Sequence, residues 1–472
     1  MDRIAKDAHL LRSDVLHILD LIPMSVSSIA PAFSIAAAYG ILVSLAGPQA
    51  IMSTFITAVP LIFAALVFRQ LNRHYPHVGA SYYWTTKILG SRAGRFQGWI
   101  ISLAYFFSIP PIVVPAGEYT LQFASAIGLI SAAAASNVFL VSITGICWVL
   151  IAIVPLVLGA KPTARFTEIF LLLELAVFAL FFGLGISNMH GHVVNSFSFS
   201  WFFSTHISIS GLAMGMAIAI TILDGWEINS YSSEESKNPK IWPGIAGIVG
   251  LLAVLAIYGV SMPLMTMETP LSALSQSTNP LATWVSYVAP QYGWVIDIAV
   301  IASTASSLWL TTFILSRAWY AMARDGHMPR FMGILHRRFR SPYMSIWLIG
   351  LLSIGINLGM LAFPTVKSFF ALLLGAAGIF LAIEFCIDCI SGTVFFWFVH
   401  RRVEVRGRHV HWTYRVMSLA GAISLAAITA IGVYYSPALI GKEFPYVFAF
   451  LLIPGVFMAL HKGRKTRANA ST

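Results

Sequence analysis

The sequence predicts an all-α integral membrane protein with twelve transmembrane helices, and three observations support this fold class. Of the 472 residues, 58% are hydrophobic and 10% are charged, whereas soluble domains carry about 25% charged residues. Apolar runs recur along the chain at roughly the 20 residues that a helix needs to cross a bilayer. Basic residues gather on one side of the resulting topology. Helices are the expected spanning element because lipid offers no partner to an unpaired backbone group.

The predicted spans follow one another from near the N-terminus to near the C-terminus. They cover residues 15–44, 48–68, 96–124, 137–158, 166–187, 206–231, 243–267, 291–321, 343–363, 368–398, 413–435 and 444–461. The polar connections between them are too short to hold a second domain. The remaining ends are predicted to be a short polar tail, 1–14, and a basic tail, 462–472.

The orientation follows from the basic residues. An even number of spans places both termini on one side, and all lysines and arginines except Lys367 and Lys442 fall on that side. Because basic loops stay inside, we expect both termini in the cytoplasm and the protein in the plasma (inner) membrane. The net charge of +11 is spread over many short loops, so no nucleic-acid partner is expected.

The sixth segment contains an unusual polar break. The run ISISGLAMGMAIAI (207–220) is followed by TILDGWEINSYSSEESKNP (221–239), and Asp and Gly are poor helix formers. One interpretation ends the helix at Leu223. The other, which we favour, is an interrupted helix with residues 221–225 unwound, because 207–223 is short for a span and apolar residues resume at Trp226.

The first segment contains a second candidate break. In IPMSVSSIAPAFSIAAAYG (22–40), Pro31 lies in mid-span, where it removes a hydrogen bond and clashes with the preceding turn. A kink without unwinding is the alternative. Interruptions in spans one and six indicate an inverted five-plus-five repeat, 15–187 and 206–398, followed by two further spans, 413–461. Half-helix ends at the breaks would offer N–H groups to an anion and carbonyls to a cation, which suits a zwitterion.

Three stretches resemble the amino acid–polyamine–organocation (APC) superfamily of secondary transporters. GASYYWTTKILGSRAGRFQGW (79–99) is similar to the family's connection between spans two and three. DGWE with EESKNPK (224–240) is similar to its break and acidic motif at span six. SRAWYAMARDGHMPRF (316–331) is similar to its motif after span eight. The order of the three stretches and their places between the spans make the resemblance specific.

The resemblance implies a LeuT-type fold and alternating-access transport of an amino acid or related amine. By position, the substrate carboxylate would meet the backbone N–H groups and hydroxyls of Ser27, Ser28, Ile29 and Ala30. The substrate ammonium would meet carbonyls near Ile218, Thr221 and Asp224, next to Gly225. Trp226 and Glu227 occupy the family's aromatic-acid positions.

The chain departs from the family pattern at both breaks. Many members have Gly-x-Gly in span one, where this chain has Ser27 to Pro31, and an apolar residue at the position of Asp224. The Asp224 carboxylate could favour cationic substrates such as polyamines or basic amino acids, or it could titrate during proton coupling.

Further ionisable residues inside spans are candidates for ion coupling, since such groups are costly in lipid. Glu174 could shuttle a proton, or could only hydrogen-bond a neighbouring helix. Glu384 and Asp388, at i and i+4, could form a second proton path or a gate. Glu227 joins the same group of candidates.

A sodium site is the less favoured alternative to proton coupling. It would use the hydroxyls of span eight, which could equally be helix-packing contacts. Those residues are Ser303, Thr304, Ser306 and Ser307. No cofactor or metal site is expected.

Three functions remain open at this point. A secondary transporter is favoured. A membrane-embedded enzyme would need a recognisable nucleophile or metal-binding motif, which the sequence lacks. A substrate sensor without turnover cannot be separated from a carrier by sequence.

Overall fold

The structure is a computed structural model that describes residues 10–204, 208–362, 366–399, 412–439 and 441–460. Residues 1–9 of the predicted N-terminal tail and the whole predicted basic tail, 462–472, lie outside this part. The α-helices are α2 (Ile18–Ile29), α3 (Pro31–Ala46), α4 (Ala50–His74), α5 (Ala80–Ile88), α6 (Ser91–Ser108), α7 (Pro110–Ala126), α8 (Ala132–Ala135), α9 (Val138–Leu158), α10 (Ala160–His192), α11 (Ile209–Thr221), α12 (Ile228–Tyr231), α13 (Trp242–Glu268), α14 (Leu271–Gln276), α15 (Pro280–Val288), α16 (Gly293–Arg324), α17 (Tyr343–Gly359), α18 (Val366–Val394), α20 (Trp412–Leu439) and α21 (Phe444–Leu460).

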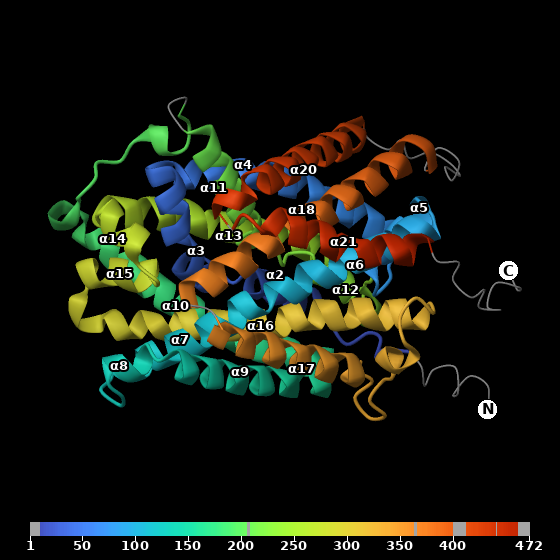
Figure 1. Ribbon diagram of the computed structural model, residues 1–472, viewed down its shortest axis with the longest axis horizontal. Helices are drawn as coiled ribbons and strands as arrows, with labels where there is room; N and C mark the ends of the chain where they lie inside the picture. The colour runs from blue at the N-terminus through green and yellow to red at the C-terminus, as the bar shows by residue number, and fades with distance from the viewer. Residues whose placement is uncertain (1–9, 205–207, 363–365, 400–411, 440, 461–472) are drawn as a thin grey trace, which may run out of the picture.

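The long helices run side by side along the longest axis of the molecule, with α14 and α15 at one end and α5 at the other (Figure 1). Among the described residues, nine helical stretches are long and apolar enough to cross a membrane by length and composition. One of these, Ile18–His74, contains α2, α3 and α4, and two shorter apolar helices are α11 and α21. The chain is therefore an all-helical, multi-pass membrane protein; the part described contains a single parallel pairing, between Leu16 and Ser236, and no sheet.

The first break lies at Ala30. Helix α2 continues to Ile29, Ala30 has left-handed backbone angles (φ 56°, ψ 70°), and Pro31 is the first residue of α3. Proline explains this local structure, since it has no N–H to donate and disfavours a helical conformation in the residue before it. The chain therefore leaves the helix for one residue, inside the bundle, where Ala30 is fully buried.

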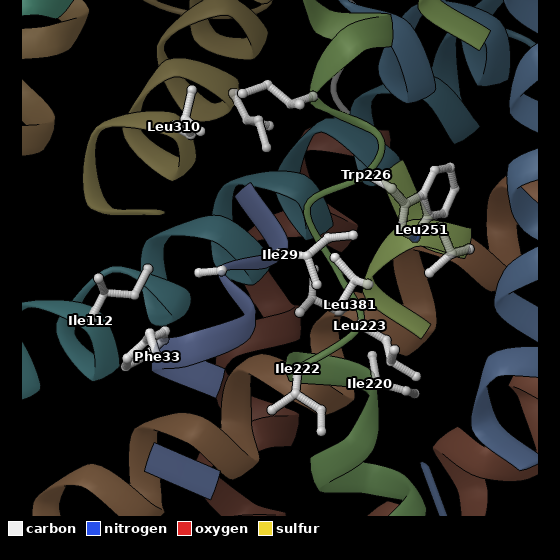
Figure 2. Close-up of a cluster of buried hydrophobic side chains, with 14 of the residues drawn as sticks. Ile29, Phe33, Ile112, Ile220, Ile222, Leu223, Trp226, Leu251, Leu310 and Leu381 are labelled. Atoms are coloured by element: carbon white, nitrogen blue, oxygen red, sulfur yellow. The ribbon is translucent and has the colours of Figure 1, made fainter. Parts of the chain in front are cut away.

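The second break is longer. Helix α11 ends at Thr221, and helical structure resumes only at Ile228, in α12. Gly225 has φ +107°, a conformation that side chains disfavour. A Cβ on this residue would lie 2.6 Å from the carbonyl carbon of Ser28 and 2.8 Å from the nitrogen of Ile29. The absence of a side chain at Gly225 thus lets the two breaks touch, and Figure 2 shows Ile29 beside the non-helical segment that carries Leu223 and Trp226.

Helices from both halves of the chain surround the breaks. α13 packs on α2 and α4, α16 packs on α7 and α10, and α18 packs on α6, α11 and α20. Their buried apolar side chains form one large cluster that includes residues of both breaks, among them Ile29 and Leu223. The breaks are therefore held in the centre of the packed bundle.

Candidate substrate site

A buried cavity of about 30 Å³ lies between the two breaks. The end of α2, next to the first break, contributes Ser28 and Ile29 to its wall. The end of α11 contributes Thr221, and the second break contributes Asp224. The other lining residues are Phe33, Ser34, Ser108, Pro111, Ile112, Ser307, Thr311, Leu374 and Ala377. Figure 2 shows Phe33 and Ile112 together. A cavity of this volume has room for a water molecule or two, so a larger solute requires its walls to move apart.

The central cavity has one acidic side chain in its described lining. Among the described lining residues, Asp224 is the only one with an ionisable side chain, and it makes no hydrogen bond or ion pair with another described side chain. Helices α2 and α11 both end here, at Ile29 and Thr221. Because a helix C-terminus carries partial negative charge, the carboxylate and the two helix ends favour a cation.

The positive end of helix α3 faces the same region but is already occupied. The N–H of Ala32 donates to Oε1 of Glu174 at 2.9 Å, and the N–H of Phe33 donates to Oγ of Ser303 at 3.2 Å. The N–H of Ser34 donates to the carbonyl of Ala30 at 2.8 Å, and Pro31 has none. The first four positions of α3 therefore offer no unpaired N–H group to a ligand.

Glu174 reaches α3 from α10 and is fully buried. Its Oε1 atom also accepts a hydrogen bond from the Ser303 hydroxyl at 2.9 Å, while Oε2 has no partner. Glu174 is therefore a carboxyl cap on the half-helix that follows the first break, together with Ser303.

The second break contains a comparable cap. The N–H of Gly225 lies 3.0 and 2.9 Å from the two carboxyl oxygens of Glu227, and the Glu227 side chain is buried. The carboxyl group that follows the Asp-Gly turn thus folds back onto the turn.

The structure differs from the predicted carboxylate site in span one. The N–H groups of Ser27, Ser28 and Ile29 lie within α2, and that of Ala30 donates to the carbonyl of Val26. The helix supplies their acceptors, because the break begins at Ala30 rather than at Ser27. The hydroxyls of Ser27 and Ser28 remain candidates for contacts with a substrate, since both are buried without a hydrogen-bond partner.

The predicted ammonium site in span six divides into two groups. Thr221 and Asp224 line the central cavity, and the carbonyl of Ile218 accepts the Thr221 hydroxyl at 2.7 Å. Trp226 does not line the cavity. Its ring packs against Phe68 and Phe385, with centroids 4.9 and 5.4 Å away.

A chain of buried acids leads from the second break into the bundle. The Tyr105 hydroxyl lies 2.9 Å from Oε1 of Glu227 and 3.4 Å from Oε1 of Glu384. The Tyr231 hydroxyl also donates to Glu384, at 2.9 Å. Asp388, one turn further along α18, accepts a hydrogen bond from Gln97 at 3.4 Å. This acid chain joins three of the predicted coupling residues.

Two oxygens of the acid chain have no partner. They are Oε2 of Glu384 and Oδ1 of Asp388, and both side chains are fully buried. The sequence alone does not mark Tyr105, Tyr231 or Gln97 as members of this chain of acids, because an isolated tyrosine or glutamine in an apolar helix is equally typical of packing. Only the fold brings them to the acids.

The four predicted sodium ligands do not converge on one point. Ser307 donates to the carbonyl of Ser28 at 3.3 Å, and Ser303 donates to Glu174. Thr304 and Ser306 donate to carbonyls within α16. The structure thus directs two of the hydroxyls toward the first break and two back onto their own helix.

The three sequence stretches that resemble the transporter family meet at the α5 end of the bundle. Arg317 donates to both oxygens of Glu235, at 3.1 and 3.3 Å, and both side chains are buried. Arg324 donates to both oxygens of Glu234, at 2.9 and 2.8 Å. Tyr82 hydrogen-bonds Asp325 at 3.1 Å. We call these contacts the closing network, because they join α5, α16 and the segment after α12 at this end of the bundle.

His77 lies within the same closing network, in the loop after α4. Its Nε2 atom faces Arg324 at 2.5 Å, and its Nδ1 atom accepts the N–H of Gly79 at 3.0 Å. Burial, and then the adjacent guanidinium, lowers the pKa of His77 to about 3. Burial alone would raise the pKa of Glu234, but the hydrogen bonds and charge of Arg324 hold that pKa below its ordinary value.

A multi-pass helical bundle with two interrupted helices around a buried, acid-bearing cavity is typical of membrane transporters. The chain belongs to the amino acid permease family, which it matches over residues 16–457. The resemblance stated from the sequence motifs is thereby confirmed.

Three relatives illustrate the family around this chain. It is 25% identical over 319 residues to the branched-chain amino acid permease BcaP of Bacillus subtilis, covering 65% of this chain and 67% of that protein. It is 25% identical to the methylthioribose transporter of the same organism, covering 67% and 69%. It is 22% identical to the low-affinity putrescine importer PlaP of Escherichia coli, covering 78% of each. The three names describe chemically different solutes.

Proposed function

We propose that this protein is a secondary active transporter that moves an amino acid or a related amine across the plasma membrane by alternating access. The observation that carries the proposal is the meeting of two interrupted helices at a buried cavity with one carboxylate. The relatives, named for transport of an amino acid, a thio sugar and a diamine, support transport over catalysis.

We further propose twelve spans, ten of them in two inverted repeats, 15–187 and 206–398. The twelve spans correspond to the nine long stretches with three additions. The stretch that holds α2, α3 and α4 counts as two spans, α2 with α3 and then α4. The shorter helices α11 and α21 count as one span each. The helix contacts support a pseudo-two-fold axis, since several contacts within the two repeats have an exchanged counterpart. α10 packs on α2 as α18 packs on α11, and α10 packs on α16 as α18 packs on α6. Three further contacts join helices that the axis would exchange with each other. They are the contacts of α4 with α13, α7 with α16, and α9 with α17.

The orientation in this proposal places both termini and the α5 end in the cytoplasm. The basic residues of the closing network support it, because Arg317 and Arg324 belong to the side that holds nearly all lysines and arginines. The α14 and α15 end then faces outward. In this state the inner end is closed by ion pairs.

We propose protons as the coupling ion. Glu174 and the acid chain of Glu227, Glu384 and Asp388 are buried carboxyl groups without a basic partner among the described residues. The scattered directions of the α16 hydroxyls give less support to a sodium site.

Proteoliposomes test the proposed function. The full chain is reconstituted, and uptake of radiolabelled amino acids and amines is measured with and without an inward proton gradient. We expect accumulation of at least one solute that increases with the gradient. Binding without any flux would indicate a sensor, and neither binding nor flux for any solute would contradict the proposal.

A further inference from the structure

The polar groups around the central cavity indicate a narrower class of solute than zwitterions. A zwitterion needs one positive and one negative pole that are both free. The free part of the negative pole is the Asp224 carboxyl group, which lines the cavity and has no partner among the described side chains. The last carbonyls of α2 and α11 lie beside it, but those of Ser28 and Ile218 already accept hydrogen bonds from Ser307 and Thr221. The positive pole is the α3 N-terminus, and its donors are all taken.

The group that occupies the positive pole is itself a carboxyl. Glu174 Oε1 accepts a hydrogen bond from the Ala32 N–H at 2.9 Å, although the two residues are 142 positions apart in the sequence. Ser303 fixes that carboxyl and supplies the acceptor for the next N–H, of Phe33. A substrate carboxylate at this helix end would have to displace Glu174, and it would meet the repulsion of a like charge if Glu174 is ionised. In the second break, Glu227 occupies the Gly225 N–H in the same manner.

The remaining described lining of the central cavity offers no basic side chain to an anion. Its described side chains are hydroxyls and apolar groups, without Lys, Arg or His. Ile29, Phe33, Ile112 and Leu374 provide an apolar surface. A single carboxylate beside an apolar wall matches a solute with one ammonium group and an apolar body.

We propose that the substrate is a small organic monoammonium ion that lacks a carboxylate, with its ammonium at Asp224 and its apolar body against Phe33, Ile112 and Leu374. The protein's own Glu174 takes the place that an amino acid's carboxylate would need. This inference rests on the proposed transport function and names the substrate class of the same site.

Matched ligand pairs that differ only in the carboxylate test this proposal. The pairs are isoamylamine with leucine and phenethylamine with phenylalanine. Binding to the full chain in detergent is measured as ligand-induced thermal stabilisation, because a ligand that binds only the folded state raises apparent stability. We expect a monoamine to bind at least about tenfold more tightly than its amino acid partner, a ratio that corresponds to ~1.4 kcal/mol.

Two variants locate the two poles. Asp224→Asn removes the charge at the ammonium pole and is expected to weaken monoamine binding by about tenfold or more. Glu174→Ala removes the side chain that occupies the Ala32 N–H, and we expect the ratio of the leucine and isoamylamine dissociation constants to narrow. Recovery of wild-type stability without ligand at pH 7 shows that either variant is folded.

The outcomes separate this inference from the function beneath it. Binding of an amino acid as tight as that of its amine would overturn the inference and leave transport intact. Unchanged monoamine affinity in Asp224→Asn would also overturn it. Binding of neither amines nor amino acids by the wild type would contradict both the inference and the proposed function.

Discussion

Gly225 is the residue on which the contact between the two breaks depends. Its φ is +107°, and a Cβ built on it would lie 2.6 Å from the carbonyl carbon of Ser28. The site therefore leaves no room for a side chain. We expect Gly225→Ala to destabilise the protein by about 2 kcal/mol or more, from backbone strain and overlap with α2. The apparent unfolding temperature in detergent measures this.

Gly355 provides the matched control. It lies within α17, and a Cβ there would have nothing within 4 Å. Gly355→Ala should be neutral or stabilising by up to about 1 kcal/mol. Equal unfolding temperatures for the two variants would show that the breaks do not depend on Gly225.

Tyr105 is the residue that connects Glu227 to Glu384. Tyr105→Phe removes only the hydroxyl, so we expect solute exchange to continue while proton-driven accumulation falls by about tenfold, as for loss of a proton-transfer group. Uptake with and without a pH gradient measures the two activities. Tyr39→Phe is the control, because the Tyr39 hydroxyl contacts Thr266 and no acid; an equal effect in both variants would argue against a relay.

His77 gives a pH dependence of stability. Its folded-state pKa of about 3 lies below the value of about 6.5 for an unfolded chain. The unfolded state therefore binds a proton first, and stability should fall as the pH decreases from about 6.5, by at most ~1.4 kcal/mol per pH unit. His77→Gln should lose this part of the acid sensitivity.

Unfolding temperatures of the two proteins should be parallel above pH 7 and diverge toward pH 5, with the wild type losing on the order of 1–2 kcal/mol more. Parallel curves down to pH 5 would contradict this assignment.

At the scale of elements, the closing network links the α12 region to α16. Arg317 and Glu235 form a bidentate pair with exposures of 0% and 2%. Arg317→Met should cost about 3–5 kcal/mol, because it leaves the Glu235 carboxylate buried and unpaired. The double variant Arg317→Met/Glu235→Met should recover a large part of that loss.

A double-mutant cycle on apparent unfolding stability measures the coupling. If the stability losses of the two single variants simply add in the double variant, Arg317 and Glu235 are not energetically coupled. The pair would then not hold the inner end closed.

The breaks in α2–α3 and α11–α12 could be predicted from sequence because their causes are local. Pro31 interrupts hydrogen bonding in its own helix, and Asp224 with Gly225 disfavours helix where it stands. The boundary of the first break could not be placed, since helix α2 continues through Ser27 and Ser28. The prediction for Asp224 and Thr221 as cavity residues needed only the position of the break.

The occupant of the α3 N-terminus could not be predicted, for a non-local reason. Glu174 is recognisable as an unusual residue in a span, but its contact with Ala32 depends on how α10 packs. The same holds for Tyr105 and Gln97, whose partners come from other helices. Sequence identified the acids, whereas the fold determines what each acid contacts.

At the scale of the whole molecule, the contacts fit one end-state of the proposed carrier. The central cavity has space for only a water molecule or two, and the α5 end is closed by ion pairs. In the proposed cycle, solute entry separates the walls formed by α2–α3, α11, α7, α16 and α18. The inverted repeats would then provide two related ways to open the same site.

A cryo-EM structure of the full chain with the tightest-binding solute of the amine and amino acid panel tests the central claim most directly. We predict ligand density in an enlarged cavity between Ser28 and Thr221, with the ligand's ammonium within hydrogen-bonding distance of the Asp224 carboxylate. Saturating ligand that is bound elsewhere, with the cavity between the two breaks still closed, would contradict the account.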